Sequence, residues 1–233
     1  MLNTIQKTVC ALAVLSATAL PALAESVDVR VVGNITPTAC MPALAGGGTV
    51  DYGNIPPSSL QADVYTTLEE KQVDFSITCD APAKVAIKAT SQRGNSAVNQ
   101  ANGSLSEVST GNTLFGLAGV AAYGLGLDGA KGIGGYGLRL APGTMMADNV
   151  AVDSIQSNGN TTTWAKTAAG SLVGTPTSIR YATWAATGTT TPIAFTTLTG
   201  RLGVHAYINK ASELDLTKPI ALDGLATLEL VYL

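Results

Sequence analysis

Two glycine-rich stretches are the first candidates for chemistry in this chain, because both have the spacing of a dinucleotide-binding motif. Gly124–Gly129 and Gly132–Gly137 each fit the pattern Gly-x-Gly-x-x-Gly. That pattern binds a pyrophosphate where it follows a strand and begins a helix within a βαβ unit. The many glycines in and around both stretches disfavour a helix there. We therefore predict strand and turn structure at both positions, and no cofactor.

The residues that could transfer a proton are few and scattered. A Ser–His–Asp arrangement would have to use His205, the only histidine of the chain. His205 lies on a predicted strand, where a partly exposed side chain is a simpler interpretation than a general base. Two pairs of carboxylates, Glu69 with Glu70 and Asp128 with Asp153, show no clustering that would mark a catalytic site. We expect the protein not to be an enzyme.

Binding of a sugar or of a nucleic acid has little support in the sequence. Trp164 and Trp184 could stack on a sugar ring, although burial of these side chains is the simpler explanation. The net charge of −3 gives no excess of basic residues that could bind a nucleic acid. We therefore expect no nucleic-acid partner.

The first 24 residues have the features of an export signal. Lys7 supplies a positive charge, Val9–Leu20 an apolar core, and Ala22–Ala24 a small-x-small cleavage pattern. We predict that residues 1–24 are a signal peptide and that the mature chain is exported through the periplasm. No other apolar run is long enough to span a bilayer, so we expect no membrane insertion.

Once the predicted signal peptide is removed together with Cys10, the mature chain has two cysteines, Cys40 and Cys79. In an oxidising compartment such an isolated pair is most simply a structural disulfide. Binding a metal would need further Cys or His ligands, which the mature chain lacks apart from His205. We predict a Cys40–Cys79 disulfide worth about 4 kcal/mol, and no metal.

Composition and patterning together predict an all-β protein. The chain is 46% hydrophobic and 12% charged and contains 25 glycines. Short runs of period-two patterning alternate with Gly, Asn, Asp and Pro clusters, and a long amphipathic helix is absent, so we predict an immunoglobulin-like β-sandwich. The predicted strands are Thr49–Ile55, Val73–Cys79, Ala83–Thr90, Ala121–Leu127, Gly135–Leu140, Val150–Ile155, Thr161–Ala165, Thr191–Phe195, Thr199–Ile208 and Ala226–Tyr232. Between them we predict a turn at Asp80–Pro82, a short helical turn within Ser58–Lys71, a surface loop over Ser91–Asn112 and a hairpin turn at Asp128–Gly129.

The segment that follows the signal has one apolar face. The residues on this face alternate along the chain, so an extended backbone places them all on the same side. In water such a face must pack against another apolar surface. At the free end of the chain it can pair with its own domain or reach another molecule. The five residues are Val27, Val29, Val31, Gly33 and Ile35.

Read together, the two ends of the chain resemble subunits of chaperone–usher pili. The pattern of Val27–Ile35, with Cys40 seven residues after its glycine, is similar to the N-terminal donor-strand extension of that family. Cys79, within an alternating strand, matches the second cysteine of those subunits. Val50–Gly53 resembles the short strand between their cysteines. Ala226–Leu233 resembles their C-terminal strand, including its penultimate tyrosine.

The resemblance covers roughly residues 26–90 and 220–233. The middle of the chain, Ser91–Lys218, is longer than in a typical major pilin and looks closer to an uncharacterised group of proteobacterial fimbrial-like proteins. In the family, the β-sandwich lacks its seventh strand, and a donor strand from a neighbouring subunit completes it. The resemblance therefore implies a structural subunit of an extracellular fimbria that polymerises by donor-strand complementation and supports adhesion.

The resemblance also implies the organisation of the mature chain and its partners. Residues 25–36 would be the donor-strand extension and residues 37–233 a single pilin-like β-sandwich domain with an enlarged middle region. The expected partners are a periplasmic chaperone, an outer-membrane usher and neighbouring pilus subunits, and the expected location is the fimbrium at the cell surface. The implied chaperone and usher recognition residues are Leu228, Leu230, Tyr232 and Leu233.

Two other functions remain open at this point. The protein could be a minor adhesive subunit whose middle region binds a host or matrix glycan. It could also be a secreted β-sandwich whose own N-terminal strand fills its own groove.

Overall fold

The computed structural model describes residues 28–34, 38–108 and 113–233. The chain divides into two units, residues 1–36 and residues 37–233, and all the strands of the described residues belong to the second unit. Within the described ranges the fold is all-β without any α-helix, which confirms the all-β part of the prediction. The described part of the chain also has no helix long and apolar enough to cross a membrane. The predicted signal peptide, residues 1–24, lies outside the described residues.

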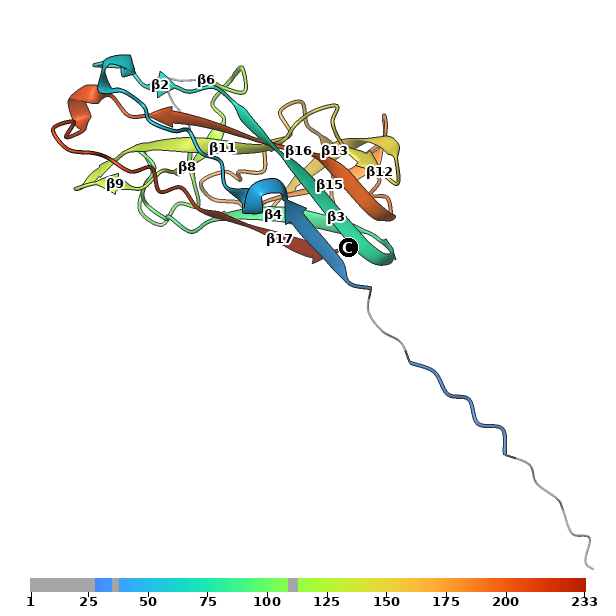
Figure 1. Cartoon of the computed structure of the whole chain (residues 1–233). Coiled ribbons are helices and arrows are strands. Elements are labelled where there is room, and N and C mark those ends of the chain that lie inside the picture. Colours follow the sequence, from blue (N-terminus) through green and yellow to red (C-terminus); the bar gives the residue numbers. More distant parts are fainter. Residues whose placement is uncertain (1–27, 35–37, 109–112) are drawn as a thin grey trace, which may run out of the picture. The chain divides into compact units, whose positions relative to one another are not determined.

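A large antiparallel sheet, nearly closed on itself, forms the second unit (Figure 1). Its strands follow the order β17-β4-β15-β13-β12-β16-β11-β8-β5. In addition, β3 pairs with β16, and β1 pairs with β3. The strands are β1 (Cys40–Leu44), β2 (Thr66–Thr67), β3 (Lys71–Ala83), β4 (Val85–Ser91), β5 (Glu107–Val108), β6 (Thr113–Leu114), β7 (Leu117–Ala118), β8 (Ala121–Gly124), β9 (Leu127–Asp128), β10 (Lys131–Gly132), β11 (Gly134–Leu140), β12 (Met146–Ala147), β13 (Val150–Asn158), β14 (Ala165–Lys166), β15 (Arg180–Ala186), β16 (Phe195–Ile208) and β17 (Ala226–Tyr232). Three short 3-10 turns complete the list: η1 (Ala45–Gly48), η2 (Pro57–Ser59) and η3 (Ala211–Glu213).

Most of the predicted strands are present. β3 and β17 contain the two predicted runs that alternate most clearly, and β16 extends the prediction of Thr199–Ile208 back to Phe195. The predicted hairpin around Asp128–Gly129 is also present, as the β9–β10 ribbon and the β8–β11 pair. Both glycine-rich motifs belong to this hairpin, and no helix follows either of them.

Two local predictions are wrong, and one strand was not predicted. The predicted turn at Asp80–Pro82 lies within β3, where the pairing of β3 with β16 shifts register, a position that tolerates proline. The predicted strand Thr49–Ile55 forms no ladder, for a reason given below. The prediction also missed β15, although this strand occupies the middle of the sheet between β13 and β4.

The helical and loop predictions are met only in part. The helical turn predicted within Ser58–Lys71 is limited to η2. The loop predicted over Ser91–Asn112 consists of turns and bends until β5 begins. Of the predicted strands Thr161–Ala165 and Thr191–Phe195, only the last residue of each belongs to a strand, Ala165 to β14 and Phe195 to β16.

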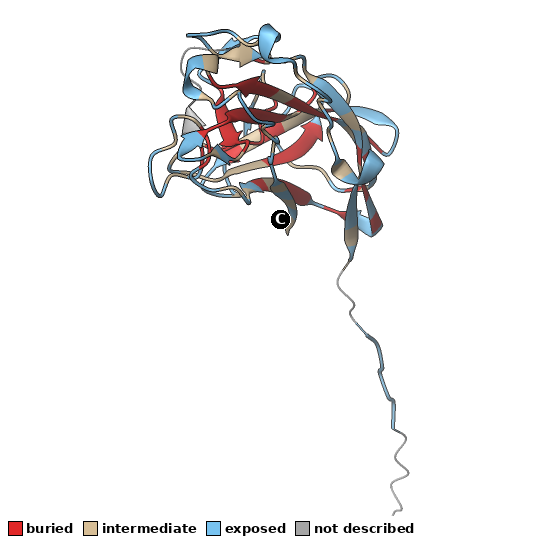
Figure 2. Ribbon diagram, turned by 60° about the vertical axis from the view of Figure 1, so that its left-hand side comes forward, coloured by how far each residue is buried: buried red, intermediate tan, exposed pale blue. Residues whose placement is uncertain are grey.

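The core lies inside the nearly closed sheet, where Figure 2 shows the buried parts of the strands, and it includes Trp184 of β15. Its side chain is fully buried, with Phe75 stacked against it at 6.5 Å and Phe195 edge-on at 5.6 Å between ring centroids. Aromatic pairs of this kind add about 0.5–1.5 kcal/mol to the effect of burial alone. The burial predicted for Trp184 is therefore confirmed, while Trp164 is only half-buried.

The predicted disulfide joins Cys40 of β1 to Cys79 of β3, with an S–S distance of 2.06 Å. The two residues are direct partners in the antiparallel β1–β3 pair, so the bond fixes the start of β1 against the sheet. A structural disulfide indicates a location outside the reducing cytoplasm.

Removing this disulfide should destabilise the domain. Replacing both cysteines by serine should lower the free energy of unfolding by about 4 kcal/mol, because the unfolded chain regains the freedom of the loop that the bond closes. Chemical denaturation of the exported protein measures the change, with the reduced wild-type protein as a matched control. Two free thiols in the non-reduced wild-type protein, detected by mass spectrometry, would contradict the assignment.

Candidate functional site

The sheet fails to close between β1 and β17. Within the described residues β17 pairs only with β4, and β1 pairs only with β3. Backbone hydrogen bonds join Gln92 to Leu225 and Leu233 to Lys84, so the odd-numbered residues of β17 exchange hydrogen bonds with β4. The even-numbered residues therefore turn their N–H and C=O groups toward the open edge. This edge offers a ladder to any further strand.

An apolar groove of about 810 Å³ lies along the opening. One wall is the chain that follows β1, residues 44–60, and the other wall is residues 214–228. Strands β11 and β16 form most of the floor between them. The apolar side chains that line the groove are Leu44, Val50, Tyr52, Ile55, Pro57, Leu60, Leu125, Ile133, Tyr136, Leu138, Leu202, Val204, Ala206, Ile208, Leu214, Leu216, Pro219, Ile220, Ala221, Leu222, Leu225, Ala226 and Leu228.

The floor is apolar because β16 places alternate residues on it. Leu202, Val204, Ala206 and Ile208 all line the groove, and each is at most 8% exposed. Residues between them point to the opposite face of the sheet, as the pleat of a strand requires. The floor is therefore part of the core that no strand covers from the groove side.

In the other wall, residues 214–222 repeat the same alternation without a regular ladder, before β17 begins at Ala226. Leu214, Ile220 and Leu222 are half-buried against the core, Leu216 is half-buried in the groove, and the residues between them are exposed. Pro219 interrupts the run and has no N–H to give to a neighbouring strand. The Asp223 N–H donates to the Leu125 carbonyl, which ties this wall to the floor.

The opposite wall is shaped by a turn at Asp51–Gly53. The Gly53 N–H donates to Asp51 Oδ1 at 2.7 Å, and Gly53 has a φ of +65°, a conformation that favours glycine. The Lys71 ammonium also donates to the Asp51 carbonyl, at 2.6 Å. These contacts bend the backbone and use its polar groups locally, which is why the predicted strand Thr49–Ile55 does not form a ladder.

Tyr52 reaches from this wall to the floor. Its hydroxyl donates to the Val204 carbonyl of β16 at 3.0 Å, and the Lys71 ammonium lies 5.2 Å from its ring centroid. Burial raises the pKa of Tyr52 to about 12, so the side chain stays neutral. The bond fixes the width of the groove at this point.

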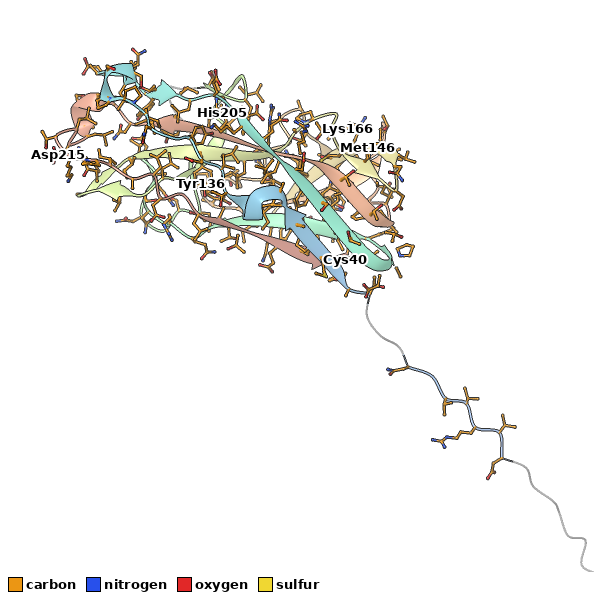
Figure 3. The ribbon with its side chains drawn as sticks, in the orientation of Figure 1. Cys40, Tyr136, Met146, Lys166, His205 and Asp215 are labelled. Carbon is orange, nitrogen blue, oxygen red and sulfur yellow. A yellow bond between two sulfur atoms is a disulfide. The ribbon has the colours of Figure 1, made fainter. Side chains whose placement is uncertain are left out.

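The two ends of the groove are polar. At one end, the Cys40 N–H donates to the Tyr232 hydroxyl at 2.8 Å and so links the start of β1 to the end of β17. At the other end, the Lys218 ammonium contacts Asp128 at 3.0 Å and Asp215 at 3.5 Å. Hydrogen bonds lower the pKa of Asp128: the larger effect comes from the Asp215 backbone N–H and the smaller from the Lys218 ammonium. Figure 3 shows Cys40 and Asp215 at opposite ends of the domain, with Tyr136 between them.

Comparisons with known proteins place the chain in a family. Residues 29–137 match a family described as "Protein of unknown function (DUF1120)". The chain is 30% identical to "Uncharacterized protein YhcF" of Escherichia coli K12, over 89% of this chain and 90% of YhcF. It is 29% identical to "Protein GltF" of the same strain, over 96% of this chain and 94% of GltF. The chain belongs to the DUF1120 family. None of these descriptions mentions a pilus.

In this DUF1120 protein, the predicted donor residues are only partly described. Val29 and Val31 are 86% and 92% exposed, and Gly33 has no atom within 4 Å of the position of a side chain. Val27 and Ile35 lie outside the described residues. The donor role therefore stays a prediction.

The predicted recognition residues divide into two pairs. Leu228 and Leu230 of β17 pack partly against the core, and Leu228 also lines the groove. Tyr232 and Leu233 are exposed, at 52% and 42%. Sequence reasoning missed Tyr52 and the whole wall from Leu214 to Leu222. The alternation of that wall was visible in the sequence, but Pro219 interrupts it.

The structure brings no catalytic group together at the candidate positions. Both ring nitrogens of His205 contact backbone groups, and Glu70 forms an ion pair with Arg139. Asp128 contacts Lys218, whereas Asp153 accepts a hydrogen bond from the Gly188 backbone. Over the described ranges, no group of three or more His, Cys, Asp or Glu side chains could hold a metal ion.

The buried tyrosines should make the DUF1120 protein sensitive to alkali. Burial raises the pKa values of Tyr52 and Tyr123 to about 12, from the ordinary tyrosine value of 10. Between these values the unfolded chain loses protons that the folded chain keeps, so stability is full below pH 10 and falls as the pH rises toward 12. Denaturation midpoints across this range, with tyrosinate absorbance as a second signal, measure the fall. Tyr52→Phe should reduce the slope, and an unchanged slope would contradict the assignment to Tyr52.

Proposed function

We propose that this protein is a structural subunit of an extracellular fimbria, and that its groove accepts the N-terminal strand of another copy of the chain. The observation that carries the proposal is the open edge of β17 beside an apolar groove. A strand that enters the groove can pair with this edge and cover the floor at the same time. The fold would then be a pilin-type, immunoglobulin-like sandwich that the donor strand completes.

The proposed donor segment matches the groove in pattern and chemistry. Val27, Val29, Val31 and Ile35 would point into the groove, and their burial contributes on the order of 6–12 kcal/mol before ordering costs. The backbone of the donor would pair with the even-numbered residues of β17. Gly33 would let the donor backbone approach the groove closely, where a side chain would collide.

Such a contact joins the N-terminal segment of one subunit to the groove of the next. Because the two surfaces differ, the contact is heterologous and does not close, so repetition gives a filament. Before assembly the open edge would be an aggregation hazard, and a periplasmic chaperone would have to cover it. An outer-membrane usher would then exchange the chaperone for the donor strand. The apolar face of β17, with Leu228 and Leu230, is the surface that we assign to the chaperone.

A peptide that spans residues 26–36 tests the proposal. Added to the domain of residues 37–233, it should raise the melting temperature as its concentration increases, because it binds the folded state alone. A matched peptide with Gly33→Leu should bind more weakly, by about 1–3 kcal/mol, because the new side chain overpacks the groove.

Two results would overturn the filament function. In the first, neither peptide changes the melting temperature of residues 37–233. In the second, the mature chain is a stable monomer that ignores the peptide and melts much earlier once residues 26–36 are deleted. The second result would mean that the strand fills the groove of its own chain.

Substitutions on β17 test the assignment to the chaperone. Leu230→Ser together with Tyr232→Ser should leave the subunit unstable in the periplasm, because the face that we assign to the chaperone is lost. Thr227→Ala on the same strand is the control, because Thr227 is exposed and lies outside the groove. Periplasmic accumulation and co-purification with the chaperone are the measurements. Normal values for the double variant would refute the assignment.

A further inference from the structure

The outer face of the open edge carries a short row of charge. Glu229 is the only charged residue of β17, and Lys88 is the only charged residue of the neighbouring β4. The two residues are direct partners in the antiparallel ladder, and the Lys88 ammonium lies 3.1 Å from Glu229 Oε2. Figure 1 shows β4 and β17 side by side.

This ion pair leaves Glu229 open on the side of the missing strand. The Glu229 side chain is 58% exposed, because Lys88 approaches it from β4 alone. Both oxygens of a carboxylate accept hydrogen bonds, so Glu229 can bind a second cation from a strand on its other side. On the far side of the opening, residues 40–44 of β1 carry no charge that could compete.

The N-terminal segment carries its own charges on the matching face. Residues 26–36 include two charged residues, Asp28 and Arg30, and both side chains are exposed. An extended backbone that turns the odd-numbered valines into the groove turns these even-numbered residues outward. They then lie on the same face of the sheet as Glu229, because β17 turns Leu228 and Leu230 toward the core.

The position of the groove decides the direction of the donor. Groove residues continue from Leu228 back to Leu214, but none follows Leu228 along β17. An antiparallel donor whose residues 27–33 cover the seven residues of β17 brings Ile35 beside Gly224, which lines the groove. A parallel donor with the same overlap carries Ile35 past the end of β17, away from the groove. The antiparallel direction therefore keeps the apolar face of the donor over the groove.

We propose that Arg30 of one copy binds Glu229 of the next copy, and that this pair sets the register of the donor strand. The pair rests on the function proposed above, because it forms only where the groove takes the N-terminal strand of another copy. With residues 27–33 covering β17, Arg30 and Glu229 are the middle partners. Lys88, Glu229 and Arg30 then alternate in charge across three strands, and opposite charges in direct cross-strand pairs are favourable.

Other registers lose this match. A shift by two residues in one direction brings Asp28 opposite Glu229, and like charges in direct pairs are destabilising. A shift by two in the other direction brings Val32 opposite Glu229 and carries Val27 past the end of β17. A shift by one residue turns the valines away from the groove. The charge row therefore distinguishes registers that the alternation of the valines leaves equivalent.

Cross-linking between full mature chains reads the register without touching the charged residues. One chain carries Thr227→Cys, and a second, differently tagged chain carries Val32→Cys, its direct partner in the proposed register. Such partners share no hydrogen bonds and approach to about 4.5 Å between Cα atoms, which suits a disulfide. Under a mild oxidant the linked dimer should form about tenfold faster with Val32→Cys than with the matched control Asn34→Cys, which lies one step along the same face.

A charge exchange within the donor tests the role of Arg30. Asp28→Arg together with Arg30→Asp keeps the net charge and leaves the accepting domain unchanged, but it brings a carboxylate opposite Glu229. The link between Val32→Cys and Thr227→Cys should then form about threefold to tenfold more slowly. Reversing the accepting row with Lys88→Glu and Glu229→Lys should restore the rate.

The outcomes separate the register from the function on which it rests. Faster linking of Asn34→Cys, or a charge exchange without effect, would overturn the register while the donor-strand function stands. No linked dimer from either donor position would overturn the function and the register together. Linking within one chain that carries both Thr227→Cys and Val32→Cys, with none between chains, would mean that the strand fills its own groove, and would also overturn the proposal.

Discussion

The open edge of β17 is the constraint on which the rest of the domain depends. A sheet that almost closes on itself buries its core from every side except the one where β1 and β17 do not pair. The core residues of β16 then form a groove floor, and the chain on either side must build walls around it. Half-buried apolar residues between Val50 and Leu60 and between Leu214 and Leu228 form these walls. The disulfide and the Tyr232 hydroxyl fix one end of the opening.

Strand β16 contributes to both the groove and the contacts that hold the hairpin of residues 113–118. It pairs with β3 on one side and with β11 on the other, so its position in the sheet is firmly set. One face supplies the groove floor, and the other carries His205 beneath the hairpin of residues 113–118. Because successive residues point to opposite faces, the groove floor and the hairpin contact share one backbone without sharing a side chain.

The sequence predicted the parts of this fold that depend on local patterning. The disulfide followed from two cysteines in an exported chain, and β16 and β17 from period-two alternation. The strand predicted at Thr49–Ile55 does not form, because Asp51 and Gly53 make a local turn. The alternation of apolar residues gives no sign of this turn. β15 was missed because its short, mixed pattern becomes a strand only through pairing on both sides. The groove depends on walls far apart in the sequence, and only the fold brings them together.

The chemistry of the groove favours an extended chain over a compact ligand. A small apolar molecule could cover the floor, but it would leave the even-numbered N–H and C=O groups of β17 without partners once water is excluded. Buried backbone groups without partners are costly, so such a complex would be weak for its contact area. A strand with alternate apolar residues satisfies both requirements together. This is why we assign the groove to the N-terminal segment of another copy, whose valines alternate in the same way.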